Sequence, residues 1–142
     1  MNREIKFRIW DKKEKRFHCP NNNAEWLVSL DGEVFHHCGG PLNKKDYALQ
    51  QYTGLEDSNE KEIYEGDILE ITQEPDFCHE PDKWYGFYGV VEFDYKSVGF
   101  RVQKYEDFGS SKKDGDSDDF YYLDRIFRTV IGNIFENPEL LK

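Results

Sequence analysis

Apolar and polar residues alternate with a period of two in short segments along the whole chain. The pattern is clearest near the start, where Ile5, Phe7 and Ile9 are separated by Lys6 and Arg8. Because successive side chains of a strand point to opposite faces of a sheet, such segments predict strands with one buried face. The remaining predicted strands are residues 16–18, 26–30, 33–36, 47–52, 67–72, 87–95, 98–104, 120–123 and 128–135.

Residues typical of turns separate these segments. Asp31-Gly32 is the strongest short hairpin signal in the chain, and Lys96-Ser97 predicts a second tight hairpin. Residues 137–141, Asn-Pro-Glu-Leu-Leu, predict one helical turn with an asparagine N-cap. The segments predicted to be turns or loops are residues 11–15, 20–23, 39–41, 54–66, 73–86 and 106–119, the last of them polar and mobile.

About ten short strands joined by turns predict a mostly β fold, as a small antiparallel barrel of the SH3-like or OB-like kind. Residues 67–135 supply the barrel, the N-terminal third packs on it as additional strands, and a short helical turn ends the chain. Aromatic residues make up 16% of the sequence, which favours a thin core built on a sheet. The chain has 142 residues and shows neither a repeat nor a linker, so we predict a single domain over residues 1–142.

Charge is distributed unevenly along the sequence, whose formal net charge is -10. The basic arm, residues 1–16, contains seven basic and three acidic residues, which gives +4. The acidic belt, residues 56–82, contains eleven acidic residues and one lysine, which gives -10. The belt fits a basic protein partner, mimicry of nucleic acid, or association with the arm of a second copy. The simpler interpretation is a solvated surface that keeps the protein soluble.

The sequence contains no apolar stretch of the length that a signal peptide or a membrane span requires. Its three cysteines are an odd number without a framework spacing, which indicates reduced thiols. We therefore expect the protein in the cytoplasm, without a membrane partner.

Three stretches of the sequence resemble the YopX family. They are residues 3–11 (REIKFRIWD), residues 51–68, which include Gln-Tyr-Thr-Gly-Leu and Lys-Glu-Ile-Tyr-Glu-Gly-Asp-Ile, and residues 130–141 (VIGNIFENPELL). The middle stretch is the most distinctive, whereas residues 12–46 and 73–119 match loosely. The resemblance implies a mostly β, self-associating protein of a bacteriophage or prophage, in a low-GC Gram-positive or similar host. It implies no known enzymatic activity and no catalytic residues to carry over.

The residues that carry the resemblance are interpreted as structural. Gly54 and Gly66 are expected in backbone conformations that a side chain would forbid, and Thr53 or Asp67 is expected to bond local backbone amides. Tyr52, Ile63 and Tyr64 are expected in the core around the turn. The alternative is a recognition surface made of Tyr52, Thr53, Tyr64, Glu65 and Asp67. The full signature is Tyr52, Thr53, Gly54, Ile63, Tyr64, Glu65, Gly66, Asp67, Ile131, Gly132, Asn133, Asn137 and Pro138.

One position departs from the family pattern. Family members often have glycine where this chain has Glu60, after Asn59. A tight turn with both central residues at positive φ favours Asn-Gly, so we expect a looser loop here.

Cysteine and histidine gather in three places: His18-Cys19, His36-His37-Cys38 and Cys78-His79. Zinc takes four such ligands, but no C-x₂-C spacing is present, and adjacent residues of a strand point to opposite faces. Whether the three places converge is open, and no metal site is predicted.

Other chemical motifs are absent from the sequence. Residues 114–118 (DGDSD) start like a calcium loop, but Asp119 and Arg125 stand where that loop requires glycine and glutamate. No glycine-rich phosphate loop and no nucleophile motif occurs. We predict no catalytic residue and no cofactor.

Two functions are compatible with these observations. The favoured one is a non-enzymatic accessory protein, a self-associating interaction module that binds a host or phage protein. The alternative is a nucleic-acid-associated factor in phage DNA replication or expression, with Lys12, Lys13, Lys15 and Arg16 as its footprint. The net acidic charge opposes the alternative, because affinity for nucleic acid comes largely from neutralising phosphates.

Overall fold

The computed structural model describes residues 4–20, 25–73, 85–109, 120–122 and 127–142. The chain divides into two compact units, residues 1–54 and residues 55–142. The single domain over residues 1–142 stays a prediction, as does the packing of the N-terminal third on the barrel.

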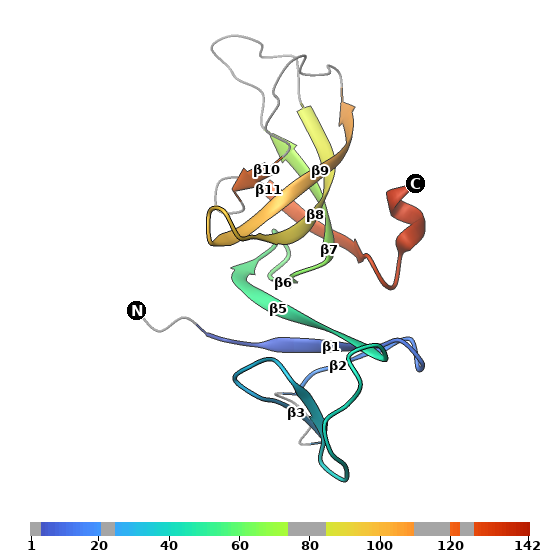
Figure 1. The fold of residues 1–142 in the computed structure, drawn as a ribbon. Coiled ribbons are helices and arrows are strands. Elements are labelled where there is room, and N and C mark those ends of the chain that lie inside the picture. Colours follow the sequence, from blue (N-terminus) through green and yellow to red (C-terminus); the bar gives the residue numbers. More distant parts are fainter. Residues whose placement is uncertain (1–3, 21–24, 74–84, 110–119, 123–126) are drawn as a thin grey trace. The chain divides into compact units, whose positions relative to one another are not determined.

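Short antiparallel strands build the first unit (Figure 1). β1 (Phe7–Asp11) lies between β2 (Arg16–His18) and β5 (Tyr47–Glu56). β3 (Trp26–Val28) and β4 (Val34–His36) form a separate hairpin. The buried core of the unit consists of Ile9, Trp26, Val34 and Tyr47.

A five-stranded antiparallel sheet makes up most of the second unit. Its strands are β7 (Asp67–Gln73), β8 (Tyr85–Asp94), β9 (Gly99–Gly109), β10 (Phe120–Tyr122) and β11 (Phe127–Asn133). They are hydrogen-bonded in the order β10-β9-β8-β7-β11, and the sheet curls into a half-barrel (Figure 1). The end of β5 belongs to this unit and is hydrogen-bonded to β6 (Glu62–Tyr64). The 3₁₀ helix η2 (Pro138–Leu141) follows β11.

Two β-bulges accompany the curl of this sheet. Tyr105 of β9 is the extra residue opposite Tyr88 and Gly89 of β8, and Ile131 of β11 is the extra residue opposite Ile68 and Leu69 of β7. Bulges bend a strand and increase its twist. A Cβ atom on Gly89 would lie 2.3 Å from Cγ1 of Val102, so glycine is needed for this close approach of β8 to β9.

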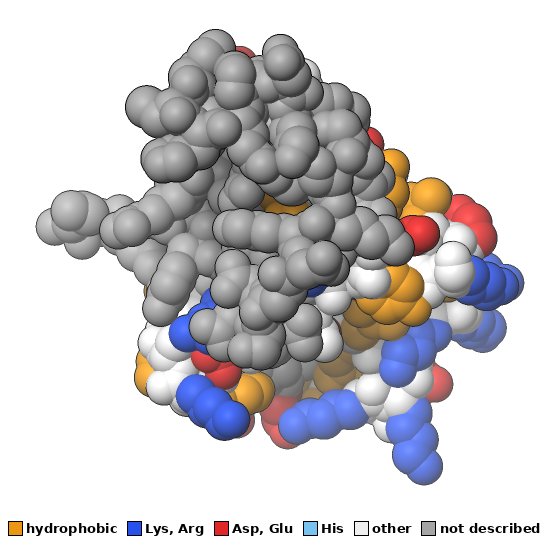
Figure 2. Space-filling model, turned by 90° about the horizontal axis from the view of Figure 1, so that it is seen from above, with side chains coloured by type: hydrophobic (Ala, Val, Ile, Leu, Met, Phe, Trp, Pro, Cys, Tyr) orange, Lys and Arg blue, Asp and Glu red, His pale blue; other side chains and the backbone are white. Residues whose placement is uncertain are grey.

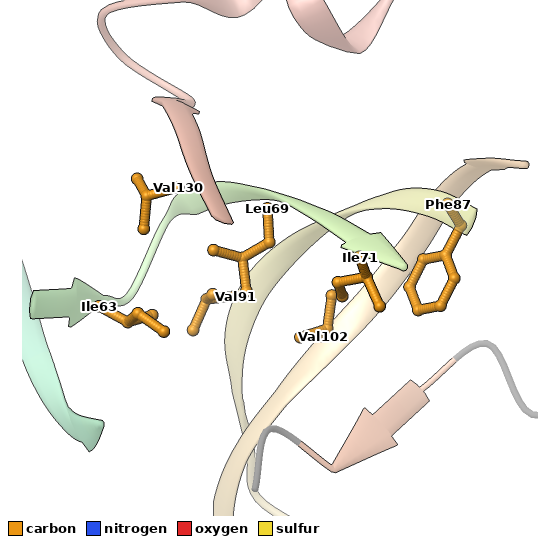
Figure 3. Close-up of a cluster of buried hydrophobic side chains, with 7 residues drawn as sticks. All are labelled: Ile63, Leu69, Ile71, Phe87, Val91, Val102 and Val130. Carbon is orange, nitrogen blue, oxygen red and sulfur yellow. The ribbon is translucent and has the colours of Figure 1, made fainter. Parts of the chain in front are cut away.

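The core of the second unit is a cluster of apolar side chains that come mainly from β7, β8 and β9 (Figure 3). Leu69 and Ile71 are two residues apart on β7, as the period of two requires, and both are fully buried. The buried cluster consists of Ile63, Leu69, Ile71, Phe87, Val91, Val102 and Val130.

The predicted mostly β, barrel-like antiparallel fold is confirmed. The C-terminal helical turn is present as η2, with Asn137 at the N-cap position and Pro138 in the first turn. The Asn137 side chain makes no capping hydrogen bond, however. Instead, its Oδ1 accepts a bond from the amide of Asn133 in β11.

Several element boundaries predicted from the sequence are wrong. The turn-rich segment 54–66 contains the end of β5 and all of β6, and residues 106–109 belong to β9 because they pair with β8 despite their polarity. Val98 is not in a strand, because its φ is 53°. The predicted loop 73–86 is wrong at both ends, because Gln73 belongs to β7 and Tyr85 and Gly86 belong to β8; β3 and β11 also end two residues before their predicted ends at 30 and 135. Residues 74–84 and 110–119 lie outside the described residues.

Two hairpin loops of three residues share one backbone geometry. In the loop from Ser29 to Glu33, the amide of Gly32 donates to the Ser29 carbonyl at 3.0 Å, and Gly32 has a φ of 81°. In the loop from Asp57 to Lys61, the amide of Glu60 donates to the Asp57 carbonyl at 3.1 Å, and Glu60 has a φ of 63°. This is the pattern of a type I turn followed by a left-handed residue. The loop at Glu60 is therefore not a tight primed turn, as expected.

Two further hairpin loops have four residues and also share a geometry. Asp11 precedes the β1–β2 loop, and Asp94 precedes the β8–β9 loop; each carboxylate accepts bonds from the amides two and three residues later. Each loop ends on a residue with a φ of 53°, Lys15 in the first and Val98 in the second. The two-residue hairpin predicted at Lys96-Ser97 is thus a longer loop that starts at an Asx turn.

Candidate functional site

The signature residues of the second unit meet around Asp67, whose side chain is buried. Its Oδ2 accepts a bond from the amide of Tyr64 at 2.8 Å, and its Oδ1 accepts one from Nδ2 of Asn133 at 3.1 Å. Oδ1 of Asn133, also buried, accepts a bond from the amide of Phe135 at 3.0 Å. These bonds tie the start of β7 to the end of β11.

Gly66 and Gly132 permit close backbone geometry beside this pair. Gly66 has a φ of 78° and follows Glu65 in the turn before Asp67, a conformation that glycine adopts without steric cost. A Cβ atom on Gly132 would lie 2.8 Å from Oδ1 of Asn137, and that oxygen accepts a bond from the amide of Asn133 at 3.3 Å. Asn137 thus bonds back to β11 instead of capping η2.

Asp57 is a further buried carboxylate, and it was not among the residues singled out in the sequence. Its Oδ2 accepts a bond from the amide of Val130 at 2.9 Å, and its Oδ1 accepts bonds from the amides of Asn59 at 2.7 Å and Lys61 at 3.0 Å. Burial alone would raise the pKa of Asp57, but these amide bonds and the charge of Lys61 lower the pKa below its ordinary value. An Asp followed by Ser-Asn was the available signal for such a turn.

Three signature residues lie in β5 of the first unit. Tyr52 is buried, its amide donates to the Lys6 carbonyl at 2.9 Å, and Nζ of Lys6 lies 5.3 Å from its ring centroid. Thr53 is half-buried, and Gly54 has a φ of 87°. A neighbouring buried amide, Gln50, accepts a bond from Nε of Arg8 at 2.8 Å.

The placements bear on the two interpretations of the signature. Tyr52, Tyr64 and Asp67 are buried and cannot form an open recognition surface, which leaves Thr53 and Glu65, both half-buried. A structural role fits this arrangement. The remaining signature positions are Ile63, fully buried, and Ile131 and Pro138, exposed.

The best candidate for an interaction site is a basic patch in the first unit. The β1–β2 loop carries Lys12, Lys13 and Lys15, and β2 begins with Arg16; all four side chains are exposed, as is that of one acidic residue, Glu14. The amide of Lys12 donates to the Asp46 carbonyl at 3.0 Å, and Nζ of Lys12 donates to the Lys45 carbonyl at 3.1 Å. The exposed Lys44 and Lys45 therefore lie beside this loop. The basic patch consists of Lys12, Lys13, Lys15, Arg16, Lys44 and Lys45.

The backbone of the basic patch is held in a fixed shape. Oδ1 of Asp11 accepts bonds from the amides of Lys13 and Glu14, both at 2.8 Å, and the Asp11 carbonyl accepts one from the amide of Lys15, also at 2.8 Å. Glu14 forms an ion pair with Arg16 at 2.6 Å, so one cation is neutralised locally. Lys13 and Lys15 form no ion pair with any residue that the structure describes. Such a cluster can attract carboxylates or phosphates. In the view of Figure 2, Lys and Arg side chains project at the edges, with acidic and apolar side chains between them.

The acidic belt carries less surface charge than its sequence suggests. Among residues 56–73, the carboxylates of Asp57 and Asp67 are buried and bonded within the second unit. The acidic side chains of that segment that reach the surface are those of Glu56, Glu60, Glu62, Glu65 and Glu70. Belt residues 74–82 lie outside the described residues.

Of the cysteine and histidine clusters seen in the sequence, the structure brings one together at a single point. His36, His37 and Cys38 bring ligand atoms within 4.8 Å of one another, whereas the exposed Cys19 is not part of that group. Cys78-His79 and the calcium-like residues 114–118 lie outside the described residues. In the described part of the chain, no helix is long and apolar enough to cross a membrane.

Comparisons with known proteins give a family and a fold. None of the curated proteins matches this sequence. A structure of protein EF1440 from Enterococcus faecalis is similar, with 26% identity over 99% of this chain and 100% of that chain, and a TM-score of 0.52. The structure of protein yopX from Bacillus subtilis, with 19% identity over 96% of this chain and 95% of that one, shows the same fold with a TM-score of 0.54. The model of the YopX protein family matches residues 6–142, so this chain belongs to the YopX family.

Proposed function

We propose that the protein is a non-enzymatic accessory protein of a phage or prophage, and that it acts as a self-associating interaction module. The basic patch of one copy binds the acidic belt of another, and the assembly binds a host or phage protein in the host cytoplasm. The observation that carries this proposal is the fixed cluster of exposed cations on a chain with a net charge of -10.

Electrostatics support contact between copies. Residues 12–16, which are the β1–β2 loop and the first residue of β2, present four exposed cations and one exposed anion, and the Asp11 side chain holds the loop backbone in place. The belt presents Glu56 and Glu60 as exposed acids close together in the sequence. Opposite charges of this kind steer association, and salt screens them with a Debye length of about 8–10 Å near physiological ionic strength.

The use of buried polar groups supports a non-enzymatic role. Asp57, Asp67 and Asn133 bond backbone amides or one another, and Gln50 bonds Arg8. Groups committed to such bonds stabilise the fold. They are not placed as a nucleophile or a general base facing a substrate.

Sedimentation velocity at increasing salt tests self-association. We expect an oligomer at low salt that dissociates as salt rises, and a K13E/K15E variant that is monomeric throughout. The K96E/K142E variant, with the same charge change at exposed positions elsewhere, is the control and should still associate at low salt. A monomeric wild type at every salt concentration would refute self-association, and association of K13E/K15E equal to wild type would refute the role of the patch.

The same patch supports the alternative of a nucleic-acid-associated factor. Anisotropy of a labelled single-stranded oligonucleotide at several salt concentrations distinguishes it. If each of the two lysines contacts a phosphate, K13E/K15E should reduce the slope of log K against log salt by about 1.4, since each contact contributes about 0.7. An unchanged slope would exclude the patch as a phosphate-binding footprint.

A further inference from the structure

A tight turn directly after β4 gathers two imidazoles and one thiol. The amide of His37 donates to the Glu25 carbonyl at 2.9 Å, and the amide of Gly39 donates to the His36 carbonyl at 2.9 Å. Only His36 is a strand residue, so the rule that adjacent strand residues point to opposite faces does not apply to His37 and Cys38. The turn can therefore bring three consecutive side chains to one point.

The ligand atoms of the three side chains lie close together. One ligand atom from each of His36, His37 and Cys38 falls within 4.8 Å of the others. Sγ of Cys38 and Nε2 of His37 are 2.8 Å apart and share a hydrogen bond. The amide of Cys38 contacts Nδ1 of His36 at 3.4 Å, a long contact that holds this ring near the turn.

The interior of the first unit positions one of these rings. His36 packs edge-on against Trp26 with ring centroids 5.7 Å apart, and Trp26 is 9% exposed. His18 stacks on Trp26 with centroids 4.3 Å apart. One ligand is thus oriented by core packing before any ion arrives, which reduces the cost of ordering the site.

We propose that His36, His37 and Cys38 bind a borderline divalent transition metal of the Zn²⁺ class. Two imidazoles and one thiolate are ligands that zinc accepts, and a water molecule can complete a tetrahedral site with three protein ligands. Binding replaces the hydrogen between Cys38 and His37: the thiol proton goes to the buffer, and sulfur and nitrogen each donate an electron pair to the metal.

A second group of possible ligands, Asp11, Glu14 and His18, is a weaker candidate. Asp11 already accepts bonds from two loop amides, and Glu14 already pairs with Arg16. A metal there would have to displace these bonds. His18 therefore serves as a control position for the proposed site.

Titration of the reduced full-length protein with Co²⁺, used as a spectroscopic substitute for Zn²⁺, tests the proposal. We expect a thiolate-to-cobalt charge-transfer absorption that Zn²⁺ abolishes, with quenching of tryptophan fluorescence because Trp26 contacts His36. C38S should lose the absorption, and H37Q should weaken binding about tenfold or more, equivalent to about 1.4 kcal/mol. C19S, C78S and H18Q are the controls and should keep the absorption.

Each result supports or overturns the site. No charge-transfer absorption in the wild-type protein at millimolar Co²⁺ would overturn it. So would an absorption that persists in C38S, or one that C78S or C19S removes. Far-UV circular dichroism checks that the variants fold, and if C38S does not fold, wild-type affinity in H37Q would overturn the site by itself.

Discussion

The loop from Ser29 to Glu33 in the first unit and the loop from Asp57 to Lys61 in the second have the same backbone turn but are stabilised in different ways. In the first loop, glycine occupies the left-handed position, and Oγ of Ser29 accepts a bond from the amide of Glu33 at 2.9 Å, within the loop itself. In the second loop, Glu60 occupies that position, and the anchoring Asp57 reaches the amide of Val130, 73 residues later. A turn with an unfavourable residue can thus be held by a long-range bond.

The two loops should differ most in the stability that is lost when the side chain holding each turn, Asp57 or Ser29, is replaced by alanine. D57A leaves the buried amide of Val130 and two loop amides without their acceptor, so we expect a loss of roughly 3–4 kcal/mol in the free energy of unfolding. S29A removes bonds within one partly exposed loop and should cost about 1 kcal/mol. Urea unfolding followed by circular dichroism measures both. Equal losses would show that the bond to Val130 contributes nothing beyond a local turn.

The anchors should also differ in their response to pH, because only Asp57 titrates. Burial opposes its charge, but the amide bonds and Lys61 lower its pKa below the ordinary 3.8. The stabilisation is therefore complete above the unfolded-state pKa and is lost as pH falls through the lower folded-state pKa. The stability difference between wild type and D57N should shrink below about pH 4, as urea unfolding from about pH 6 to about pH 2.5 would measure. Asp31 and Asp94, whose pKa values are also lowered, are present in both proteins and cancel in this difference. A constant difference would contradict the assignment.

The smallest effect is expected at the left-handed positions themselves. G32A places a Cβ atom at a φ of 81° and should cost about 1 kcal/mol, although the nearest side-chain atom is 3.9 Å away. E60G removes a similar strain of about 1–2 kcal/mol but adds about 0.5–1 kcal/mol of unfolded-chain entropy, so a gain between zero and about 1.5 kcal/mol is expected. E60A, which keeps the Cβ atom, is the control for E60G. If E60G were less stable than E60A by the full entropy cost of about 0.5–1 kcal/mol, Glu60 would carry no backbone strain.

The four-residue loops show that one backbone can present different chemistry. The β1–β2 loop presents three lysines, whereas the β8–β9 loop presents one, Lys96, beside the apolar Tyr95 and Val98, which are 86% and 77% exposed. Each loop follows an aspartate, Asp11 or Asp94, whose side chain accepts a bond from the amide two residues later. Such a turn could be predicted, because aspartate is typical of this position. The left-handed residue could not, because neither lysine nor valine signals it.

Much of the fold could be predicted from the period of two. The strands at 16–18 and 67–73 and the helical turn after Asn137 lie within a residue or so of their predicted bounds. The prediction failed where pairing overrides local composition: β6 lies in a turn-rich segment, and the polar end of β9 pairs with β8.

One candidate site could be predicted from the sequence, whereas the others depend on tertiary structure. The cations of the β1–β2 loop were visible in the sequence, because charge on a turn between two strands stays exposed. Tertiary structure alone decided that Asp57 bonds Val130, that Asp67 bonds Asn133 across 66 residues, and that a turn after β4 gathers His36 to Cys38. The sequence by itself determined the alternation, the turn residues and the family, since each depends on neighbours along the chain. The buried bonds depend on which strands become neighbours in space, and that is settled only when the sheet forms.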